Sequence, residues 1–193
     1  MKQLVLASNN PGKIKEFSSI FAAIGIEIIP QAKLNVPEID EPYFTFVENS
    51  LHKARHCSKV TGLPALADDS GLCVNALNGK PGVFSARYAG LPRNDAKNNV
   101  KLIEDLQGHN DRSAFYYVVL VMVNGCNDPR PIIADGSLHG EIVDKAQGNG
   151  GFGYNPHFYL PEYKMTIAEL DSEIRNQISH RALAIKNLMA KIS

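Results

Sequence analysis

The chain opens on a short apolar run that stops at a group of turn-forming residues. Residues 2–8 read Lys-Gln-Leu-Val-Leu-Ala-Ser, which predicts a buried strand. The next letters are "NNPGK", where Asn10 is a good helix N-cap and Pro11 takes the favoured first helical position. Apolar side chains then recur at helical spacing, at Ile14, Phe17, Ile20, Phe21 and Ile24. We therefore expect a helix that ends at Gly25, followed by a second strand over "IEIIP".

Further along, the pattern predicts a second helix, an interrupted strand and a third helix. The letters "TFVE" at residues 45–48 have the spacing of a capping box. The apolar stripe of the helix that follows comprises Val47, Leu51, Ala54 and Cys57. Residues 64–75, "PALADDSGLCVN", predict a strand, a turn and a second strand. The stretch "LNGKPGVFSARYAG" predicts a loop, and residues 94–106 predict a helix.

The last third of the chain predicts a β ribbon, a glycine-rich loop and a final helix. Residues 113–123 and 131–143 are long strand candidates on either side of the turn "NGCNDP". The letters "GNGGFGYNP" follow as a loop, and the chain is helical from residue 179 onward. The apolar side of that helix comprises Ile185, Leu188, Met189 and Ile192. Strands alternating with helices, plus a ribbon, predict a mixed α/β protein with no internal repeat and no long linker.

Composition and charge exclude several classes of protein. The 193 residues suit one domain, and 20 Lys and Arg balance 20 Asp and Glu, so a polymeric nucleic acid partner is disfavoured. The three cysteines form no CxxC pair, disulfide framework or zinc motif. The longest apolar stretch, "AFYYVVLVMV", falls far short of the roughly 20 residues that a membrane span needs. We expect a globular cytoplasmic protein without membrane contact.

Two polar clusters in the first half of the chain suggest anion and metal chemistry. The stretch "SNNPGK" places the first-turn amides and a lysine at a helix start, which suits a phosphate, although an ordinary capped turn explains it as well. Asp68 and Asp69 end an apolar strand, where two carboxylates suit Mg2+ or a catalytic base. Because neighbouring strand side chains point to opposite faces, both enter one site only if the chain turns between them. A solvated Asp-rich turn is the alternative, and Glu38, Asp40 and Glu41 form either a further metal-binding loop or a solvated one.

Two clusters in the second half suggest recognition of a flat ring. The letters "GGFGYNP" surround an aromatic with glycines, which suits stacking on a base, while a tight turn with a core Phe152 is the alternative. "SHRAL" opens the last helix with His180 and Arg181, cations that are unfavourable at a helix start without an anion or acceptor nearby. His52 and His56 have metal spacing, but Lys53 stands where the zinc-protease motif has Glu. That face suits a basic surface, from which Lys53 reaches a phosphate.

Together these stretches resemble the inosine triphosphate pyrophosphatase family, the dITP/XTP pyrophosphatases that cleanse nucleotide pools. The resemblance rests on five segments in family order: "LASNNPGKIKEF", "TFVENSLHKARH", "ALADDSGLCVNALNGKPGVFSARYAG", "GGFGYNPHF" and "ISHRA". It implies an elongated mixed α/β fold, with a central mixed sheet flanked by helices and a second β-rich lobe. Residues 1–193 would form a single domain of two lobes around one cleft, usually as a homodimer. It also implies a Mg2+-dependent cleavage of purine nucleoside triphosphates to monophosphate and pyrophosphate.

The resemblance also implies roles for individual residues. Asp69 would be the proton acceptor and a metal ligand, and Asp40 would be the second metal ligand. The residues implied to bind substrate are Ser8, Asn9, Asn10, Pro11, Gly12, Lys13, Lys53, Ser70, Phe152, Gly153, Tyr154, Asn155, Arg175, His180 and Arg181. The first six and Lys53 would hold the triphosphate, Phe152 to Asn155 would bracket the base, and His180 with Arg181 would contact its edge.

The chain departs from the family pattern at two positions. The aromatic loop usually ends in an acid where this chain has Asn155, and a lysine is usual where this chain has Arg175. The first change removes a charge, and the second keeps the charge but changes its geometry. We expect retained activity with shifted base selectivity. Two alternatives stay open, a pyrophosphatase for other modified nucleotides and a non-catalytic nucleotide-binding protein.

Overall fold

The computed structural model describes residues 2–192 and contains five α-helices and seven strands within that range. The helices are α1 (Pro11–Ala22), α2 (Phe46–Thr61), α3 (Asp95–Asp105), α4 (Ser172–Ile178) and α5 (His180–Ile192). The strands are β1 (Gln3–Leu6), β2 (Glu27–Pro30), β3 (Ala65–Val74), β4 (Ser113–Val123), β5 (Ile132–Ile142), β6 (Phe158–Leu160) and β7 (Met165–Thr166). Short 3-10 turns cover Gln31–Leu34, Asn75–Leu77, Gly82–Arg87 and Asn155–His157. None of the described helices is long and apolar enough to cross a bilayer.

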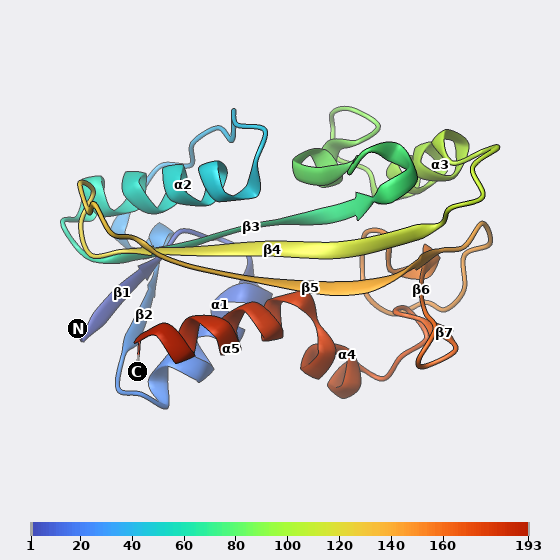
Figure 1. Ribbon diagram of the computed structural model, residues 1–193. Coiled ribbons are helices and arrows are strands. Elements are labelled where there is room, and N and C mark those ends of the chain that lie inside the picture. The colour runs from blue at the N-terminus through green and yellow to red at the C-terminus, as the bar shows by residue number, and fades with distance from the viewer. Residues whose placement is uncertain (1, 193) are drawn as a thin grey trace. The chain divides into compact units, whose positions relative to one another are not determined.

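The strands form one mixed sheet in the order β2-β1-β3-β4-β5-β6-β7 (Figure 1). β1 pairs in parallel with β2 and β3, whereas β6 pairs antiparallel with β5 and β7. A mixed α/β fold with a mixed sheet flanked by helices is therefore confirmed. The chain divides into two compact units, each described by itself below. The prediction of a single domain around one cleft stays a prediction.

The first unit comprises residues up to Asp69, with Val119–Ala134 and the chain from Asn187 onward. Its strand order β2-β1-β3 makes the two helical crossovers run in opposite directions along the sheet. Right-handed crossovers of that kind put α1 and α2 on opposite faces, as Figure 1 shows. α1 buries Phe17 and Phe21, and α2 buries Ala54 and Cys57. β1 lies between them with three consecutive buried residues.

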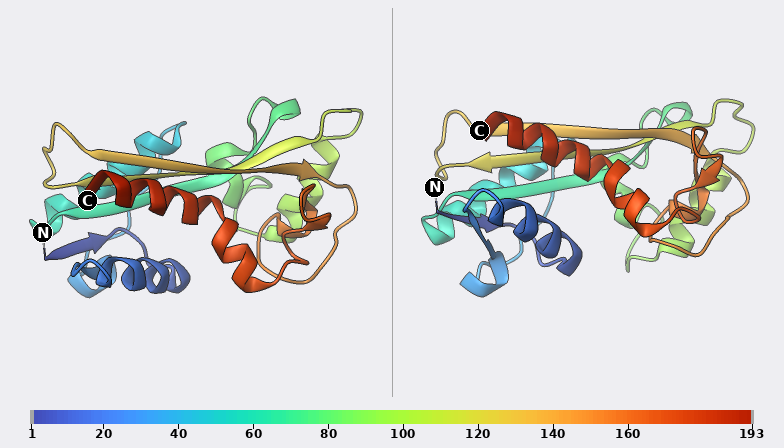
Figure 2. Two further views of the ribbon diagram at one scale, coloured as in Figure 1. Left: turned by 60° about the horizontal axis from the view of Figure 1, so that its bottom comes forward. Right: turned by 90° about the horizontal axis from the view of Figure 1, so that it is seen from below.

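The second unit comprises residues 70–118 and 135–186. Its core joins β3, α3 and β6 through buried Leu72, Leu102, Leu106 and Phe158. The first turns of α5 lie against β5 (Figure 2), at a point where the strand carries Gly136. A Cβ on Gly136 would lie only 2.2 Å from the carbonyl oxygen of His180, so only glycine permits this approach.

Several sequence predictions are corrected by the structure. Residues 65–74 form one continuous strand, so the predicted turn within this stretch is wrong. Nearly all residues of the strand are buried, and a continuous strand keeps their backbone N–H and C=O groups hydrogen-bonded. α1 ends at Ala22, three residues before Gly25, and Ile24 is exposed where the pattern placed it on the apolar side. The pattern also missed α4, β6 and β7, which are too short to show a hydrophobic period.

Candidate active site

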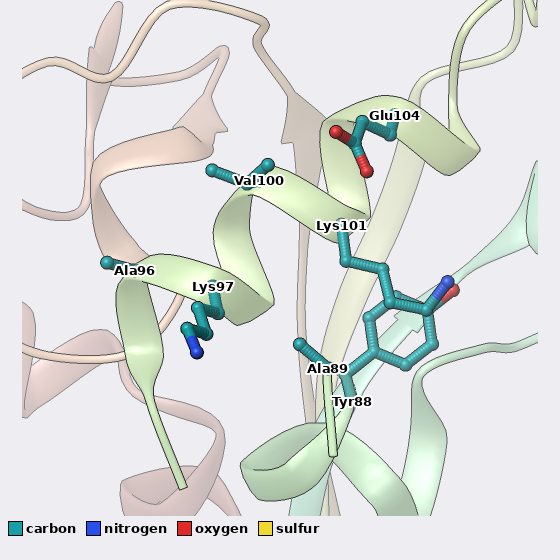
Figure 3. Close-up of a pocket in the computed structure, with 7 residues that line it drawn as sticks. All are labelled: Tyr88, Ala89, Ala96, Lys97, Val100, Lys101 and Glu104. Atoms are coloured by element: carbon teal, nitrogen blue, oxygen red, sulfur yellow. The ribbon is translucent and has the colours of Figure 1, made fainter.

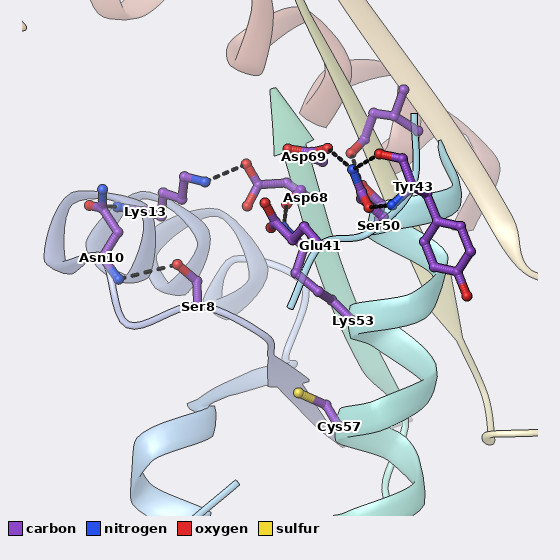
Figure 4. Close-up of polar contacts among 12 residues, drawn as sticks. Ser8, Asn10, Lys13, Glu41, Tyr43, Ser50, Lys53, Cys57, Asp68 and Asp69 are labelled. Atoms are coloured by element: carbon purple, nitrogen blue, oxygen red, sulfur yellow. Dashed lines mark hydrogen bonds and ion pairs between the residues drawn. The ribbon is translucent and has the colours of Figure 1, made fainter. Parts of the chain in front are cut away.

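The end of the first-unit part of β3 carries two buried carboxylates that face different helices. Asp68 and Asp69 are 1% and 7% exposed. Because the strand is continuous, their side chains point to opposite faces. One Asp68 oxygen lies 2.7 Å from Nζ of Lys13 in the first turn of α1, and Asp69 accepts a hydrogen bond of 3.1 Å from the Asn49 amide in α2 (Figure 4). Each carboxylate therefore meets the start of the helix on its own face.

Lys53 links the backbone of β3 at Asp68 to the loop that precedes α2. Its ammonium donates to the Asp68 carbonyl oxygen at 2.7 Å and to the carboxylate of Glu41. Burial acts to lower the pKa of Lys53, but the charges of Asp68, Glu41 and Asp69 outweigh burial and raise it above the usual value. Lys53 is therefore a permanent cation inside an acidic cluster, which we define as Glu41, Lys53, Asp68 and Asp69.

Asp69 is the member of the acidic cluster with the chemistry of a general base. Burial raises its pKa from 3.8 to about 6, and the charges of Glu41 and Asp68 act in the same direction. The Lys53 ammonium and the Asn49 hydrogen bond act in the opposite direction and limit the rise. A carboxylate with a pKa near the working pH is largely ionised at neutral pH and still basic enough to take a proton from water.

The acids of residues 38–41 occupy different positions. Glu38 is exposed and accepts a 2.6 Å hydrogen bond from Asn9, and Asp40 is also exposed. Glu41 is half-buried, and its carboxylate contacts Lys53 within the acidic cluster. The structure thus brings Glu41 to the catalytic candidate, and the role of Asp40 as a metal ligand stays a prediction.

The start of α1, at residues 8–13, is capped by the side chain of Asn10. Asn10 Oδ1 accepts from the amides of Gly12 at 2.9 Å and Lys13 at 3.3 Å, and Ser8 Oγ accepts from the amide of Asn10. Asn10 and Pro11 therefore take their predicted places in the helix cap. The expectation of free first-turn amides is wrong, because the cap side chain satisfies two of them.

This cap gives a matched test of structure against ligand binding. Asn94 caps α3 in the same way, accepting from the amide of Lys97 at 3.0 Å. We expect Asn10→Ala and Asn94→Ala each to lower the free energy of unfolding by about 1 kcal/mol, measured by urea denaturation. Only Asn10→Ala should also raise the KM for a nucleoside triphosphate, by several-fold. Equal KM changes in both variants would remove residue 10 from triphosphate binding.

The second unit holds the glycine-rich loop in a defined shape. The Gly153 amide donates to Asp95 at 2.9 Å, and Asn99 donates to the Gly153 carbonyl at 3.0 Å. Tyr154 is buried and donates to the Ser85 carbonyl at 2.7 Å, whereas Phe152 is 68% exposed. The alternative of a core Phe152 is therefore wrong, because Tyr154 is the aromatic that packs inside. Asp95 and Asn99 support this loop from α3, a role that their sequence spacing gave no means to detect.

The remaining predicted residues of the second unit lie at the same loop or at the start of α5. A Cβ on Gly150 would lie 2.8 Å from a guanidinium nitrogen of Arg175, so that side chain lies against the loop. Asn155 is buried and follows the loop directly, and His180 opens α5 with a ring stacked on Tyr116. Arg181 follows it and is half-buried. Ser70 follows Asp69 in β3 and is half-buried, and its contact with substrate stays a prediction.

Two other features of the chain offer no comparable chemistry. A pocket of about 590 Å³ lies between residues 88–89 and α3, lined by residues that include Tyr88, Val100 and Lys101 (Figure 3). None of the predicted site residues lines it.

Burial raises the pKa of the Cys57 and Cys73 thiols to about 11, so neither is a thiolate nucleophile at neutral pH.

Comparison with known proteins gives consistent matches along the whole chain. A model of the Ham1 family matches residues 4–191. A dITP/XTP pyrophosphatase of Chromobacterium violaceum is 58% identical, covering 98% of this chain and 96% of its own, and one of Ralstonia nicotianae is 54% identical, covering 100% and 97%. The solved structure of a HAM1 protein from Coxiella burnetii superposes with a TM-score of 0.97 at 46% identity, covering 100% and 98%. The Staphylococcus aureus Ham1 protein gives a TM-score of 0.92 at 41% identity, covering 99% and 98%.

Proposed function

This chain belongs to the Ham1 family, and from that premise we propose that it is a nucleoside triphosphate pyrophosphatase acting on deaminated purine nucleotides. Its substrates would be ITP, dITP and XTP, and its products the monophosphate and pyrophosphate. Relatives named dITP/XTP pyrophosphatase match it from end to end at more than half identity. The enzyme would remove damaged precursors from the nucleotide pool.

The observation that carries the proposal is the setting of Asp69. Its carboxylate is buried, held by the Asn49 amide, and has a pKa of about 6 beside a permanently charged Lys53. An ordinary aspartate on the protein surface would be solvated and fully ionised at neutral pH. A proton acceptor next to fixed cations is what hydrolysis of a polyanion needs.

The chemistry follows from these positions. Water attacks the α-phosphorus, forming a new P–O bond while the bond to the bridging oxygen of the β-phosphate breaks. Asp69 takes the proton that the water loses. The leaving pyrophosphate carries negative charge that Lys13 and Lys53 stabilise. Since Lys13 pairs with Asp68 at 2.7 Å, this buried carboxylate fixes where the Lys13 ammonium lies.

The donor atoms of the acidic cluster fit Mg2+. Carboxylate oxygens are the hard ligands that Mg2+ prefers, and Glu41 and Asp69 supply them around one lysine. Within residues 2–192 no group of three or more His, Cys, Asp or Glu side chains is arranged to hold a metal. Mg2+ usually takes only one or two carboxylates and completes its shell with substrate phosphates and water. Bound there, it would neutralise charge on the phosphates. Asp40 remains the alternative second ligand.

Base selectivity is assigned to the second unit. Donors facing the 6-position would bind the keto oxygen of hypoxanthine or xanthine, whereas the amino group of adenine would leave them unpaired. Phe152 is exposed and available for stacking, and His180 and Arg181 supply donors. Asn155 replaces the usual acid with a neutral amide, and Arg175 replaces the usual lysine beside Gly150. We expect both to shift the preference among purines without touching the acidic cluster.

The proposal is tested with purified protein, Mg2+ and a panel of ITP, XTP, GTP, ATP and dUTP. We expect kcat/KM for ITP and XTP to exceed that for ATP by at least about tenfold, because leaving one buried hydrogen-bond donor unpaired costs about that factor. Monophosphate and pyrophosphate should appear in equal amounts. Release of orthophosphate or a preference for dUTP would favour another class of hydrolase. Tight binding of ITP without turnover would favour a nucleotide-binding protein, and equal turnover of ATP and ITP would refute the selectivity.

The proposal carries further predictions about the surroundings of the enzyme. A cytoplasmic location, a homodimer and the absence of a polymeric nucleic acid partner or membrane contact follow from the sequence predictions. The first is consistent with a nucleotide pool as the source of substrate. Size-exclusion chromatography with light scattering tests the second, and a monomer at working concentration would contradict it.

A further inference from the structure

Tyr116 of β4 contacts two predicted base-binding residues that lie far apart in the sequence. Its phenol donates a 3.1 Å hydrogen bond to Oδ1 of Asn155. Its ring is stacked on the ring of His180, with centroids 5.2 Å apart and an interplanar angle of 13°. Asn155 follows the glycine-rich loop and His180 opens α5, so one side chain touches both recognition elements of the second unit.

Tyr116 is itself held in place. Its ring packs against buried Phe158 at a centroid distance of 4.7 Å, and a strand of the sheet carries its backbone. Burial raises the pKa of the Tyr116 phenol above its usual value, so the group stays protonated and is a hydrogen-bond donor. The backbone of His180 is also held, because the start of α5 packs closely over Gly136 of β5.

The orientation of the Asn155 amide depends on this phenol. An amide has one acceptor end and one donor end, and the Tyr116 donor selects the acceptor end. The opposite end then lies over the loop, since a Cβ on Gly151 would come within 2.1 Å of Asn155 Nδ2. The backbone of Asn155 is bonded as well: its carbonyl oxygen accepts from the Ala168 backbone amide at 3.3 Å, and its N–H donates to the Phe152 carbonyl oxygen at 3.3 Å. The loop and the Asn155 side chain are therefore fixed together.

We infer that Tyr116 is a positioning residue for base selectivity, which orients the Asn155 amide by its hydroxyl and the His180 ring by stacking. This inference rests on the proposed function. Tyr116 acts through these two residues and is not assigned a contact with the substrate. Without the hydroxyl, the Asn155 amide is free to turn its donor and acceptor ends, and the site loses the fixed pattern that rejects a 6-amino group.

The matched control is the next residue of the same strand. Tyr117 points to the opposite face of β4, where its hydroxyl donates to Asp135 at 3.1 Å. Tyr116→Phe and Tyr117→Phe thus remove the same chemical group, and with it the hydrogen bond to Asn155 in the first variant and to Asp135 in the second. Only the first change touches the recognition elements. Both substitutions keep the ring, so both variants should fold, which thermal denaturation checks.

The experiment compares kcat and KM for ITP and ATP in the wild-type protein and the two variants. Tyr116→Phe should lower the ITP-to-ATP ratio of kcat/KM about tenfold, the effect of one misaligned hydrogen bond, through KM for ITP and with kcat nearly unchanged. Tyr117→Phe should leave the ratio unchanged. In an Asn155→Ala background, Tyr116→Phe should have no further effect, because its target is gone. An unchanged ratio in Tyr116→Phe, or an undiminished effect in the Asn155→Ala background, would overturn the inference.

A second measurement separates this inference from the proposed function. The side-chain amide resonances of Asn155 are recorded by NMR on the protein without nucleotide. They should shift or broaden in Tyr116→Phe and stay unchanged in Tyr117→Phe. If the wild-type protein hydrolysed no purine triphosphate, the proposed function would fail while this measurement still decided the role of Tyr116. Unchanged resonances in Tyr116→Phe would refute it.

Discussion

Replacing Asp69 by asparagine is expected to lower kcat for ITP about a thousandfold, because the variant keeps the shape of the side chain and loses the proton acceptor. Binding of ITP should persist, since Lys13 and Lys53 are untouched. The measurement is steady-state kinetics of pyrophosphate release, together with calorimetric binding of ITP. Activity within about threefold of the wild-type protein would remove Asp69 from the mechanism.

The same variant should be more stable than the wild-type protein at neutral pH. The pKa of Asp69 rises from 3.8 in the unfolded chain to about 6 in the folded one. The stability that its protonated form contributes is therefore complete below about pH 4 and is lost as the pH rises through about 6. A rise of roughly two pKa units corresponds to about 3 kcal/mol. Asn at position 69 does not ionise, so the variant avoids this loss. We expect its free energy of unfolding at pH 8 to exceed that of the wild-type protein by about 1–3 kcal/mol, measured by urea denaturation.

Opposite changes in activity and stability would mark Asp69 as a strained functional group. The pH series provides the internal control, because the two proteins should have nearly equal stability at pH 4 and diverge above it. A variant less stable than the wild-type protein at pH 8 would show that the ionised carboxylate stabilises the fold. That result would contradict the assigned pKa.

Lys53→Met is expected to have the second largest effect. Lys53 is the cation among Glu41, Asp68 and Asp69, and it holds the pKa of Asp69 down against burial. Without it, the pKa of Asp69 must rise above about 6. The midpoint of the kcat/KM profile against pH, near 6 in the wild-type protein, should move upward. At pH 7 we expect activity to fall about a hundredfold, with partial recovery at higher pH, and stability to fall by about 3 kcal/mol because the buried carboxylates lose their partner.

Lys59→Met is the matched control for this change. Lys59 lies in the last turn of the same helix α2 and is exposed. Its replacement removes an equal charge at a distance from the acidic cluster, so the pH midpoint and stability should stay within experimental error. A midpoint in Lys53→Met below that of the wild-type protein would contradict the arrangement, since removing a cation cannot lower the pKa of a carboxyl group.

Local signals in the sequence were enough to predict most elements of the first unit. Asn10 and Thr45 each cap a helix where the pattern placed the cap, because capping depends on a few neighbouring residues. The strand at residues 113–123 has the predicted bounds, since an apolar run of that length has no alternative to burial. These features need no knowledge of the tertiary structure.

Features that depend on tertiary contacts were not predictable. The acidic residues at 68–69 suggested a turn, yet β3 continues through them because Lys13 and Asn49 satisfy the two carboxylates from opposite faces. Glu41 could not be distinguished from Asp40 by spacing alone. Tyr116 stands in an apolar strand where nothing in the sequence indicates its contacts with Asn155 and His180. Each of these depends on residues brought together by folding.

The central claim is that water attacks the α-phosphorus of a deaminated purine triphosphate. Hydrolysis of ITP in 18O-labelled water, followed by mass spectrometry of both products, tests it most directly. We predict one 18O atom in each inosine monophosphate and none in pyrophosphate. Label in pyrophosphate, or a diphosphate product with labelled orthophosphate, would contradict the account.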